Sequence, residues 1–412
     1  DRTDSGNVAS LYKETGGDLR YIPELKSFMA WVDGRWEMDP SGVHAHEMAL
    51  SVAGGYTKHA QKLFADSMKP HLNDKERERI QAAAKSIRNW ASQCRNKHKL
   101  DAMLGLAKRD RRFVVEASKL DQDSNLLGVQ NGVVHLPTGE LRVDSKEDFV
   151  TKRCSVDYNP MAKAERWELF ISEITSSGGR LVGGELQRKE RPHLAEYLQK
   201  LLGYGLTGST AEQILIIMWG LGSNGKNVLL DTVVKAVGEY AETVSPEILM
   251  ATRFDNGADS ATPSIRKLAG ARLAISGESK EGQKLEASIV KRHTGGGFIT
   301  ARGLHQSPMT FSITHKLILM TNTPPPVDHM DVAMQGRINM IPFDMRWNRP
   351  GEVDPDPNLP DAQKDLMEVL DAELEGILLW LVQGAVAYFA QGLHPPPEVT
   401  STTRNYLDSQ DS

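Results

Sequence analysis

The sequence has little cysteine, no excess of basic residues and no long apolar run. Its 412 residues include two cysteines, Cys94 and Cys154. Neither has CxxC spacing, which excludes a four-thiolate zinc site, and we expect two unpaired, buried thiols in a reducing cytoplasm. The formal net charge is −5. A wholly basic nucleic-acid surface is therefore excluded, and any nucleic acid must be held by a local patch.

No apolar stretch approaches the roughly 18–20 residues that a membrane span needs, so we expect no membrane partner. The chain opens on Asp1-Arg2-Thr3-Asp4 without a charged-then-apolar leader, and we expect no signal peptide. Hydrophobic residues make up 40 % of the chain. That share and the length predict two or three domains with ordinary buried cores.

The first part of the chain, to about residue 155, is predicted to be α+β. Residues 30–36 form two short apolar segments around Asp33-Gly34, a preferred two-residue hairpin loop. Residues 74–99 have helical composition, and residues 127–136 read as strands and turns. Further on, we expect a helix from about Ala164, an exposed loop over residues 176–191, and a helix with core-like spacing through Leu194 and Leu202.

From Gln213 onward, short buried strands alternate with helices. Three continuous apolar runs, at residues 214–219, 271–276 and 317–321, fit a parallel sheet covered on both faces. After residue 346 we expect a loop at 354–360 and one long helix over 362–390. Gly392 and the prolines at 395–397 end that helix.

A phosphate-binding loop follows the first of these strands. The GxxxxGK pattern ends in Asn instead of Ser or Thr, and its candidate nucleotide-binding residues are Gly220, Gly222, Ser223, Asn224, Gly225, Lys226 and Asn227. Glycines let backbone N–H groups surround a triphosphate, and the lysine neutralises its β and γ oxygens. A helix is expected over residues 226–237, with its N-terminus at the phosphates. The Asn227 amide oxygen is a usable ligand for Mg²⁺, but poorer than a hydroxyl; the alternative is a degenerate site with slow turnover.

Two further strands each end in a polar residue. Glu278 follows the strand at 271–276 and is a candidate to hold Mg²⁺ or polarise the attacking water. Asn322 follows the strand at 317–321, at the end where ligands of open α/β sheets bind. It could orient the water or contact the γ-phosphate; the alternative is a turn-forming Asn before Pro324.

This ordered set resembles superfamily 3 AAA+ helicases. Residues 281–302, 316–324 and 337–343 are similar to the phage and plasmid primase-helicase family, and residues 131–133 and 157–160 resemble the poxvirus-type domain that precedes such motors. The resemblance implies an α/β fold: an AAA+-like P-loop core with a parallel sheet, an α+β N-terminal domain before it and a helical C-terminal segment after it. The domains it implies are 1–155 (poxvirus-type N-terminal domain), 156–205 (helical collar or linker), 206–345 (ATPase core) and 346–412 (C-terminal helical segment).

The resemblance also assigns roles. Lys226 would bind the phosphates of ATP, Glu278 would serve Mg²⁺ and water activation, Asn322 would be the sensor, and Arg337 would be an arginine finger reaching a neighbouring subunit's ATP. A finger supplied in trans makes hydrolysis depend on a closed ring. The sequence departs from the family at Asn227 and at Gly336, where many relatives carry a bulky or basic residue.

Two segments are candidates for DNA binding. The resemblance implies that residues 298–313 form a hairpin in a central channel, with contacts to single-stranded DNA from Lys291, Arg292, Arg302 and His305; such phosphate contacts carry no sequence preference. A second basic run has seven Lys/Arg in the 18 residues 95–112. That run could hold incoming DNA or a primase, or it could be a solvated helical face.

We therefore expect a hexameric, ATP-dependent DNA helicase motor of a phage or plasmid replication protein, acting with ATP and Mg²⁺ on single-stranded or forked DNA in the host cytoplasm. Two alternatives remain: a P-loop ATPase that remodels or loads DNA complexes without processive unwinding, and a nucleotide-gated oligomeric scaffold with little turnover. This chain has no zinc-binding cysteine set for primer synthesis. A primase is thus expected as an additional domain or as a partner.

Overall fold

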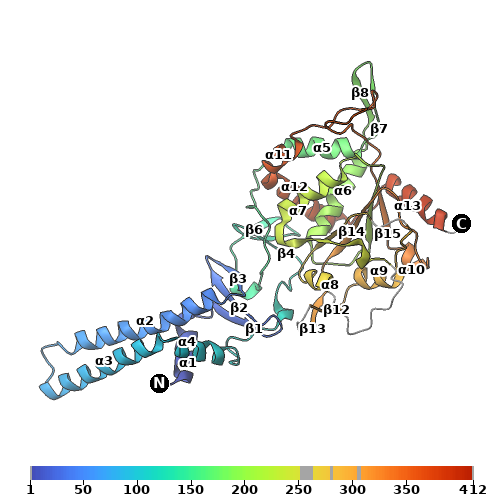
Figure 1. The fold of residues 1–412 in the computed structure, drawn as a ribbon. Helices are drawn as coiled ribbons and strands as arrows, with labels where there is room; N and C mark the ends of the chain where they lie inside the picture. Colours follow the sequence, from blue (N-terminus) through green and yellow to red (C-terminus); the bar gives the residue numbers. More distant parts are fainter. Residues whose placement is uncertain (1, 251–262, 279–281, 304–307, 411–412) are drawn as a thin grey trace. The chain divides into compact units, whose positions relative to one another are not determined.

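The computed structural model describes residues 2–250, 263–278, 282–303 and 308–410 (Figure 1). The chain divides into two compact units: residues 1–120 with 145–151, and residues 121–144 with 152–412. The four domains expected from the sequence stay a prediction.

The N-terminal unit combines a small sheet with helices. Helix α1 (Asp4–Thr15) precedes the antiparallel strands β1 (Leu19–Ile22), β2 (Ser27–Val32) and β3 (Arg35–Asp39). Asp33 and Gly34 both have positive φ between β2 and β3, which confirms the predicted hairpin. Helices α2 (Val43–Asp66) and α3 (Asp74–Cys94) form a helical hairpin, and α4 (Lys97–Ala107) follows. Asn73 and Glu76 form a capping box that starts α3.

The larger unit begins with the antiparallel strands β4 (Leu126–Val129), β5 (Gly132–His135) and β6 (Glu140–Arg142). It then has α5 (Glu165–Thr175) and α6 (Pro192–Leu206), which start close to the predicted positions. The five α6 residues with core-like spacing, from Leu194 to Leu202, are all buried. Residues of β4 and β5, among them Leu127 and Val134, belong to the same core as α5, α6 and the main sheet.

The main sheet has five parallel strands in the order β10-β11-β14-β9-β15. They are β10 (Ala241–Val244), β11 (Leu273–Ser276), β14 (Lys316–Thr321), β9 (Leu215–Trp219) and β15 (Ile338–Pro342). The three strands predicted from apolar runs are β9, β11 and β14, and all three are buried. Helix α7 occupies Lys226–Val237, as predicted. The expectation of a parallel α/β sheet is confirmed.

Helices and short elements surround this sheet. They are α8 (Pro263–Lys267), α9 (Ala287–Thr294), α10 (Val332–Gln335), α11 (Leu366–Asp371), α12 (Leu374–Gln391), α13 (Pro397–Gln410) and the hairpin β12 (Phe298–Arg302) with β13 (Pro308–Ser312). The register of that hairpin pairs Phe298 with Ser312 and Arg302 with Pro308. The strands predicted at residues 298–313 are therefore confirmed.

Residues 176–191 correct the sequence prediction of a loop. They form the antiparallel hairpin β7 (Ser177–Val182) and β8 (Glu185–Lys189). Gly183 and Gly184 both have positive φ and make the two-residue turn. Most residues of both strands are exposed, so the segment lacks the apolar alternation that identifies a half-buried strand.

The single helix predicted over residues 362–390 is also wrong. The structure has two helices, α11 and α12, separated at Ala372-Glu373. The Glu373 carboxylate accepts the backbone N–H groups of Arg166 at 3.0 Å and Trp167 at 2.9 Å. The break therefore supplies an acceptor for the otherwise unsatisfied first turn of α5.

Helix α12 corrects the statement that no apolar run is long enough for a membrane span. Its 18 residues meet that criterion by length and composition, alone among the helices in the described part of the chain. However, eight of its residues are buried against the rest of the unit, including Ile377, Leu381 and Ala385. Burial of this kind is typical of a core helix.

Both cysteines are unpaired and buried, as predicted. Burial raises the pKa of the Cys154 thiol to about 12, and it also raises the pKa of Cys94. Neither thiol is therefore activated as a nucleophile near neutral pH.

Candidate functional site at the carboxyl edge of the sheet

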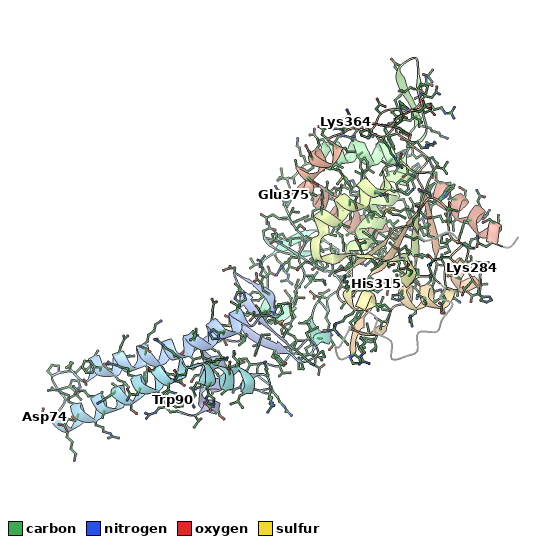
Figure 2. All side chains as sticks on the ribbon, viewed as in Figure 1. Asp74, Trp90, Lys284, His315, Lys364 and Glu375 are labelled. Carbon is green, nitrogen blue, oxygen red and sulfur yellow. The ribbon has the colours of Figure 1, made fainter. Side chains whose placement is uncertain are left out.

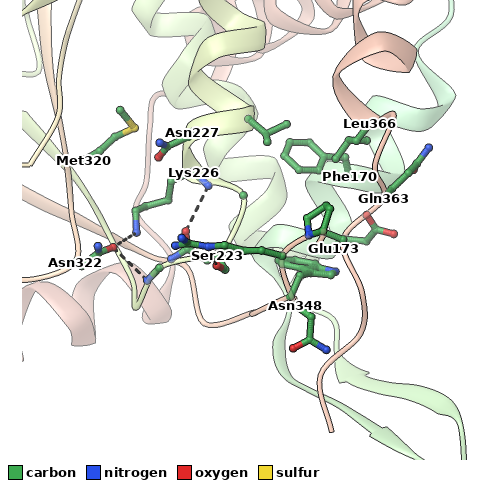
Figure 3. A pocket seen from close by; sticks show the side chains of 18 of the residues that line it. Phe170, Glu173, Ser223, Lys226, Asn227, Met320, Asn322, Asn348, Gln363 and Leu366 are labelled. Carbon is green, nitrogen blue, oxygen red and sulfur yellow. Dashed lines mark hydrogen bonds between the residues drawn. The ribbon is translucent and has the colours of Figure 1, made fainter. Parts of the chain in front are cut away.

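The ends of three neighbouring parallel strands bring the predicted site residues together. Strand β14 lies between β9 and β11, and their register places Thr321 opposite Trp219 and Leu319 opposite Ser276. The loop after β9 carries Lys226, the residues after β11 carry Glu278, and Asn322 follows β14 directly. All three side chains line one cavity of about 530 Å³ (Figure 3).

The loop between β9 and α7 has the tight backbone that the glycine pattern predicts. A Cβ at Gly220 would lie 2.2 Å from the Phe343 carbonyl oxygen, so no side chain fits there. Gly225 has φ +84°, and a Cβ there would lie 2.5 Å from a methyl group of Ile174. The loop therefore needs glycine at both positions for close packing and for the turn into α7.

Asn322 connects the three strand ends by hydrogen bonds. Its Oδ1 accepts from Lys226 Nζ at 3.1 Å and from the Gly222 backbone N–H at 3.2 Å (Figure 3). Its own backbone N–H donates to Glu278 Oε1 at 2.9 Å. The Asn322 side-chain oxygen thus lies where two donors of the loop, Lys226 Nζ and the Gly222 N–H, point toward the same acceptor.

Lys226 is buried, and its Nζ also donates to the Gly220 carbonyl oxygen at 2.6 Å. Burial lowers the pKa of Lys226 to about 8, and the nearby Glu278 carboxylate partly opposes that shift. Desolvation disfavours the charged amine in the free protein. A polyanion beside Nζ would restore the charge.

Asn227 lies on the cavity wall, and its side chain is exposed. The Asn227 side chain makes no hydrogen bond to the described residues. Glu278 lies on the same wall. Amide and carboxylate oxygens are both hard ligands, and Mg²⁺ is commonly held by one or two of these together with substrate phosphates and water. The donor set therefore fits Mg²⁺ with a bound phosphate; the described residues contain no cluster of three His, Cys, Asp or Glu that would hold a metal alone.

The opposite wall of the cavity is aromatic and apolar. Phe170 of α5 and Leu366 of α11 lie there, with Glu173 and Gln363 beside them (Figure 3). Trp347 also lines the cavity, and its backbone N–H donates to the Ser223 carbonyl oxygen at 3.0 Å. Arg166 donates to Gln363 Oε1 at 3.0 Å and to Glu173 Oε2 at 3.1 Å. One end of the cavity is therefore polar and lined by backbone N–H groups of the loop. The other end is apolar, at Phe170 and Leu366, with polar side chains at its margin.

Arg349 also belongs to this site, and the sequence prediction missed it. Its Nε donates to Ser223 Oγ at 2.8 Å, beside the loop. Arg349 and Trp347 follow β15, whose residue Pro342 is opposite Trp219 of β9. The rule that ligands bind beyond the carboxyl ends of parallel strands would have found them if it had been extended to β15. No sequence motif with a fixed spacing predicts that Phe170 or Leu366 lines the cavity.

Arg337 does not line the cavity of its own chain. Its guanidinium donates to Thr294 Oγ1 at 3.0 Å, the Ala333 carbonyl oxygen at 2.6 Å and Gln213 Oε1 at 3.2 Å. Gly336 is in right-handed helical conformation, and a Cβ there would meet nothing closer than 3.6 Å. The role of Arg337 as a finger stays a prediction.

The four candidate DNA-binding residues are in different environments. Lys291 Nζ forms an ion pair with Asp331 at 2.5 Å, whereas Arg292 is exposed on α9. Arg302 is exposed at the end of β12, and His305 lies outside the described residues. Phe298, which begins β12, is 70 % exposed and is an additional candidate for contact with a base.

The fold and site define a mixed α/β protein with a P-loop-like core. A family model described as "D5 N terminal like" matches residues 9–176. The chain is 26 % identical to a putative helicase of Acanthamoeba polyphaga mimivirus over 294 residues, which are 70 % of this chain and 29 % of the relative. It is 25 % identical to a putative primase of African swine fever virus over 218 residues, 52 % of this chain and 21 % of that protein.

Among solved structures, the apo NrS-1 C-terminal region matches with a TM-score of 0.54 and 10 % identity, covering 98 % of this chain and 74 % of the other. This likeness concerns the fold alone. The chain spans less than a third of the length of either curated relative above. Taken together, the matches confirm the resemblance to the D5-type primase-helicase family.

Proposed function

We propose that this chain is the ATP-hydrolysing motor of a DNA helicase, of the superfamily 3 AAA+ type, from a phage or plasmid replication protein. It would act in the host cell cytoplasm as a homo-hexameric ring that translocates on single-stranded DNA. The observation that carries the proposal is the convergence of Lys226, Glu278 and Asn322 on one cavity beside the GxxxxGK loop.

In the proposed complex, ATP would lie in the cavity in one orientation. The triphosphate would lie at the loop, where a phosphate oxygen replaces Asn322 Oδ1 as acceptor for Lys226 Nζ and the Gly222 N–H. The N-terminus of α7 adds a favourable dipole. The base would lie against Phe170, Trp347 and Leu366 at the apolar end.

Hydrolysis needs an activated water and stabilisation of the charge that develops on the phosphates. Glu278 would accept a proton from the water, and the Asn322 amide would orient that water or contact the γ-phosphate. Asn227 and Glu278 would hold Mg²⁺, which when bound neutralises charge on the β- and γ-oxygens. Arg337 would complete the site of the neighbouring subunit.

DNA would contact the hairpin β12–β13 and the end of α9, through Arg292, Arg302 and His305, with Lys291 beside them. Single-stranded or forked DNA is the expected substrate. A primase domain or partner would supply primers.

Asn227 favours a second candidate, an oligomeric DNA-binding scaffold gated by nucleotide. If an amide in place of the usual hydroxyl holds Mg²⁺ too weakly, nucleotide would bind without appreciable turnover. Turnover by the assembled chain separates the two candidates.

Lys226→Ala tests the assignment of the site. We expect ATP turnover to fall by about 100-fold or more, because the phosphates lose their charge partner in a buried position. Steady-state phosphate release measures this. Lys235→Ala is the matched control: this lysine is on the same helix and pairs with Asp371 at 2.7 Å. Normal turnover in Lys226→Ala would refute the site.

A further inference from the structure

The N-terminal unit carries a one-sided concentration of positive charge on α3 and α4. Residues 79–100 include six Lys/Arg and no Asp or Glu, in a chain whose net charge is −5. We name four exposed members of this run the basic face: Lys85, Arg88, Arg95 and Lys97. In Figure 2, the helix that carries it runs from Asp74 past Trp90.

Helical spacing places these cations on one side of α3. Lys85, Arg88 and Arg95 are separated by three and seven residues, which puts them within an arc of about 80° and along about 15 Å of axis. Ala84, Ala91 and Cys94, which are buried, lie on the adjoining arc of the same helix, so the cations border the packed side of α3. Lys97 is the first residue of α4 and continues the series.

Three other cations of the region, Lys99, Lys108 and Arg112, contact groups within the protein. Lys99 Nζ pairs with Asp4 Oδ1 at 2.9 Å and lies 5.0 Å from the centre of the Trp90 ring. Lys108 lies over the rings of Tyr21 and Phe28, and Arg112 pairs with Asp110 at 2.6 Å. By contrast, no member of the basic face has an ion-pair partner among the residues that the structure describes.

A face of this kind differs from an ordinary solvated helix surface. Solvated faces usually carry acids three or four residues from their bases, and such pairs stabilise the helix. Here the spacing of Lys85 and Arg88 sets like charges side by side, which costs helix stability. The arrangement is favourable when a polyanion supplies the missing negative charge.

The chemistry of the face indicates which polyanion. Single-stranded nucleic acids are held by basic grooves with aromatic rings on which bases stack. The described residues of α3 and α4 offer no exposed Phe, Tyr or Trp ring: Trp90 is half-buried, and its ring N–H donates to Asn7 Oδ1 at 3.2 Å. Contacts to phosphate alone are sufficient for duplex DNA.

We propose that the basic face of α3 and α4 binds the phosphate backbone of duplex DNA. This contact is separate from the hairpin β12–β13 and from the nucleotide cavity, so it does not depend on ATP turnover. It gives the chain a second DNA contact, which would recognise the duplex part of a fork without reading its sequence.

The test measures binding of the full chain to a fluorescently labelled duplex over a series of salt concentrations. The quadruple variant Lys85→Ala/Arg88→Ala/Arg95→Ala/Lys97→Ala removes four phosphate contacts. The slope of log K against log salt should become shallower by roughly three to four, because each contact releases about 0.9 counterion on B-DNA. Affinity at low salt should fall at least about tenfold.

The matched control is Lys58→Ala/Lys62→Ala/Lys69→Ala/Lys75→Ala, which removes the same charge from the same helical hairpin. Its slope should change by less than one. Arg88→Lys/Arg95→Lys, which keeps the charge, should bind like the unmodified chain. An unchanged slope in the alanine variant, an equal loss in the control, or a loss confined to single-stranded DNA would each overturn the proposal.

Discussion

At the scale of single residues, the unusual feature is a buried lysine whose ammonium group is held by an amide oxygen and a carbonyl oxygen. Lys226 bonds to Asn322 and Gly220, and burial lowers its pKa to about 8. A bound triphosphate would raise this pKa again, so nucleotide binding takes up a proton when the free lysine is neutral.

We therefore expect ATP affinity to fall as the pH rises from about 8 towards 10, because the free protein then carries a neutral Lys226. Calorimetry in two buffers of different ionisation enthalpy should show proton uptake on binding in this range. Lys226→Arg keeps its charge throughout and should remove both effects if it still binds. Proton uptake that persists in that variant would assign the titration to another group.

Asn227 gives the second prediction at this scale. Asn227→Ser should keep or raise Mg²⁺-dependent turnover, by up to about tenfold, because a hydroxyl is the usual ligand at this position. Titration of turnover with Mg²⁺ measures the change. Complete loss of turnover would mean that the amide has another role in the site.

Three site residues could be predicted because one rule joins them: parallel strands place their carboxyl ends at one edge. Lys226, Glu278 and Asn322 follow β9, β11 and β14, and the sequence pattern of each strand is clear. Phe170 and Leu366 come from helices whose position over the loop depends on tertiary packing. The residues around Phe170 and Leu366 in the sequence do not predict this packing.

At the scale of elements, the close contact of α6 with α12 depends on small residues. A Cβ at Gly384 would lie 2.2 Å from the Gln199 carbonyl oxygen, and one at Gly203 would lie 2.1 Å from the Ala385 nitrogen. The helix axes are therefore close enough for backbone to contact backbone, and a side chain at either position must push them apart.

Gly384→Ala should lower the free energy of unfolding by about 1–3 kcal/mol, the usual cost of overpacking. Urea unfolding of the full chain measures this. Gly336→Ala is the control, since its Cβ would meet nothing closer than 3.6 Å and its φ of −65° suits alanine. Equal stability of Gly384→Ala and the unmodified chain would contradict the packing described.

The two elements that the sequence prediction missed have different causes. In the hairpin β7–β8 most side chains are exposed, so its pairing depends on backbone hydrogen bonds and a Gly-Gly turn rather than on an apolar pattern. The break between α11 and α12 satisfies the first turn of α5, which lies 206–207 residues earlier in the chain. Neither cause is visible in local composition.

At the scale of the whole molecule, the proposed motor needs more than one chain. Arg337 is absent from the lining of its own cavity, as a residue that serves a neighbour would be. Arg337→Ala should bind ATP normally and lose about 10³-fold or more of its turnover in the assembled oligomer.

Gln213→Ala is the control for that variant, because it removes one hydrogen bond to Arg337 but leaves the charge. It should retain most of its turnover. Failure of Arg337→Ala to bind ATP would show that the residue supports its own chain's site, and the role in trans would be wrong.

The proposed helicase function is tested by the rate of ATP turnover with and without single-stranded DNA, at concentrations where mass measurement shows oligomers. The expected result is a hexamer whose turnover is stimulated by DNA. Nucleotide binding without turnover in a formed ring would contradict it, and would favour the scaffold in which Asn227 holds Mg²⁺ too weakly.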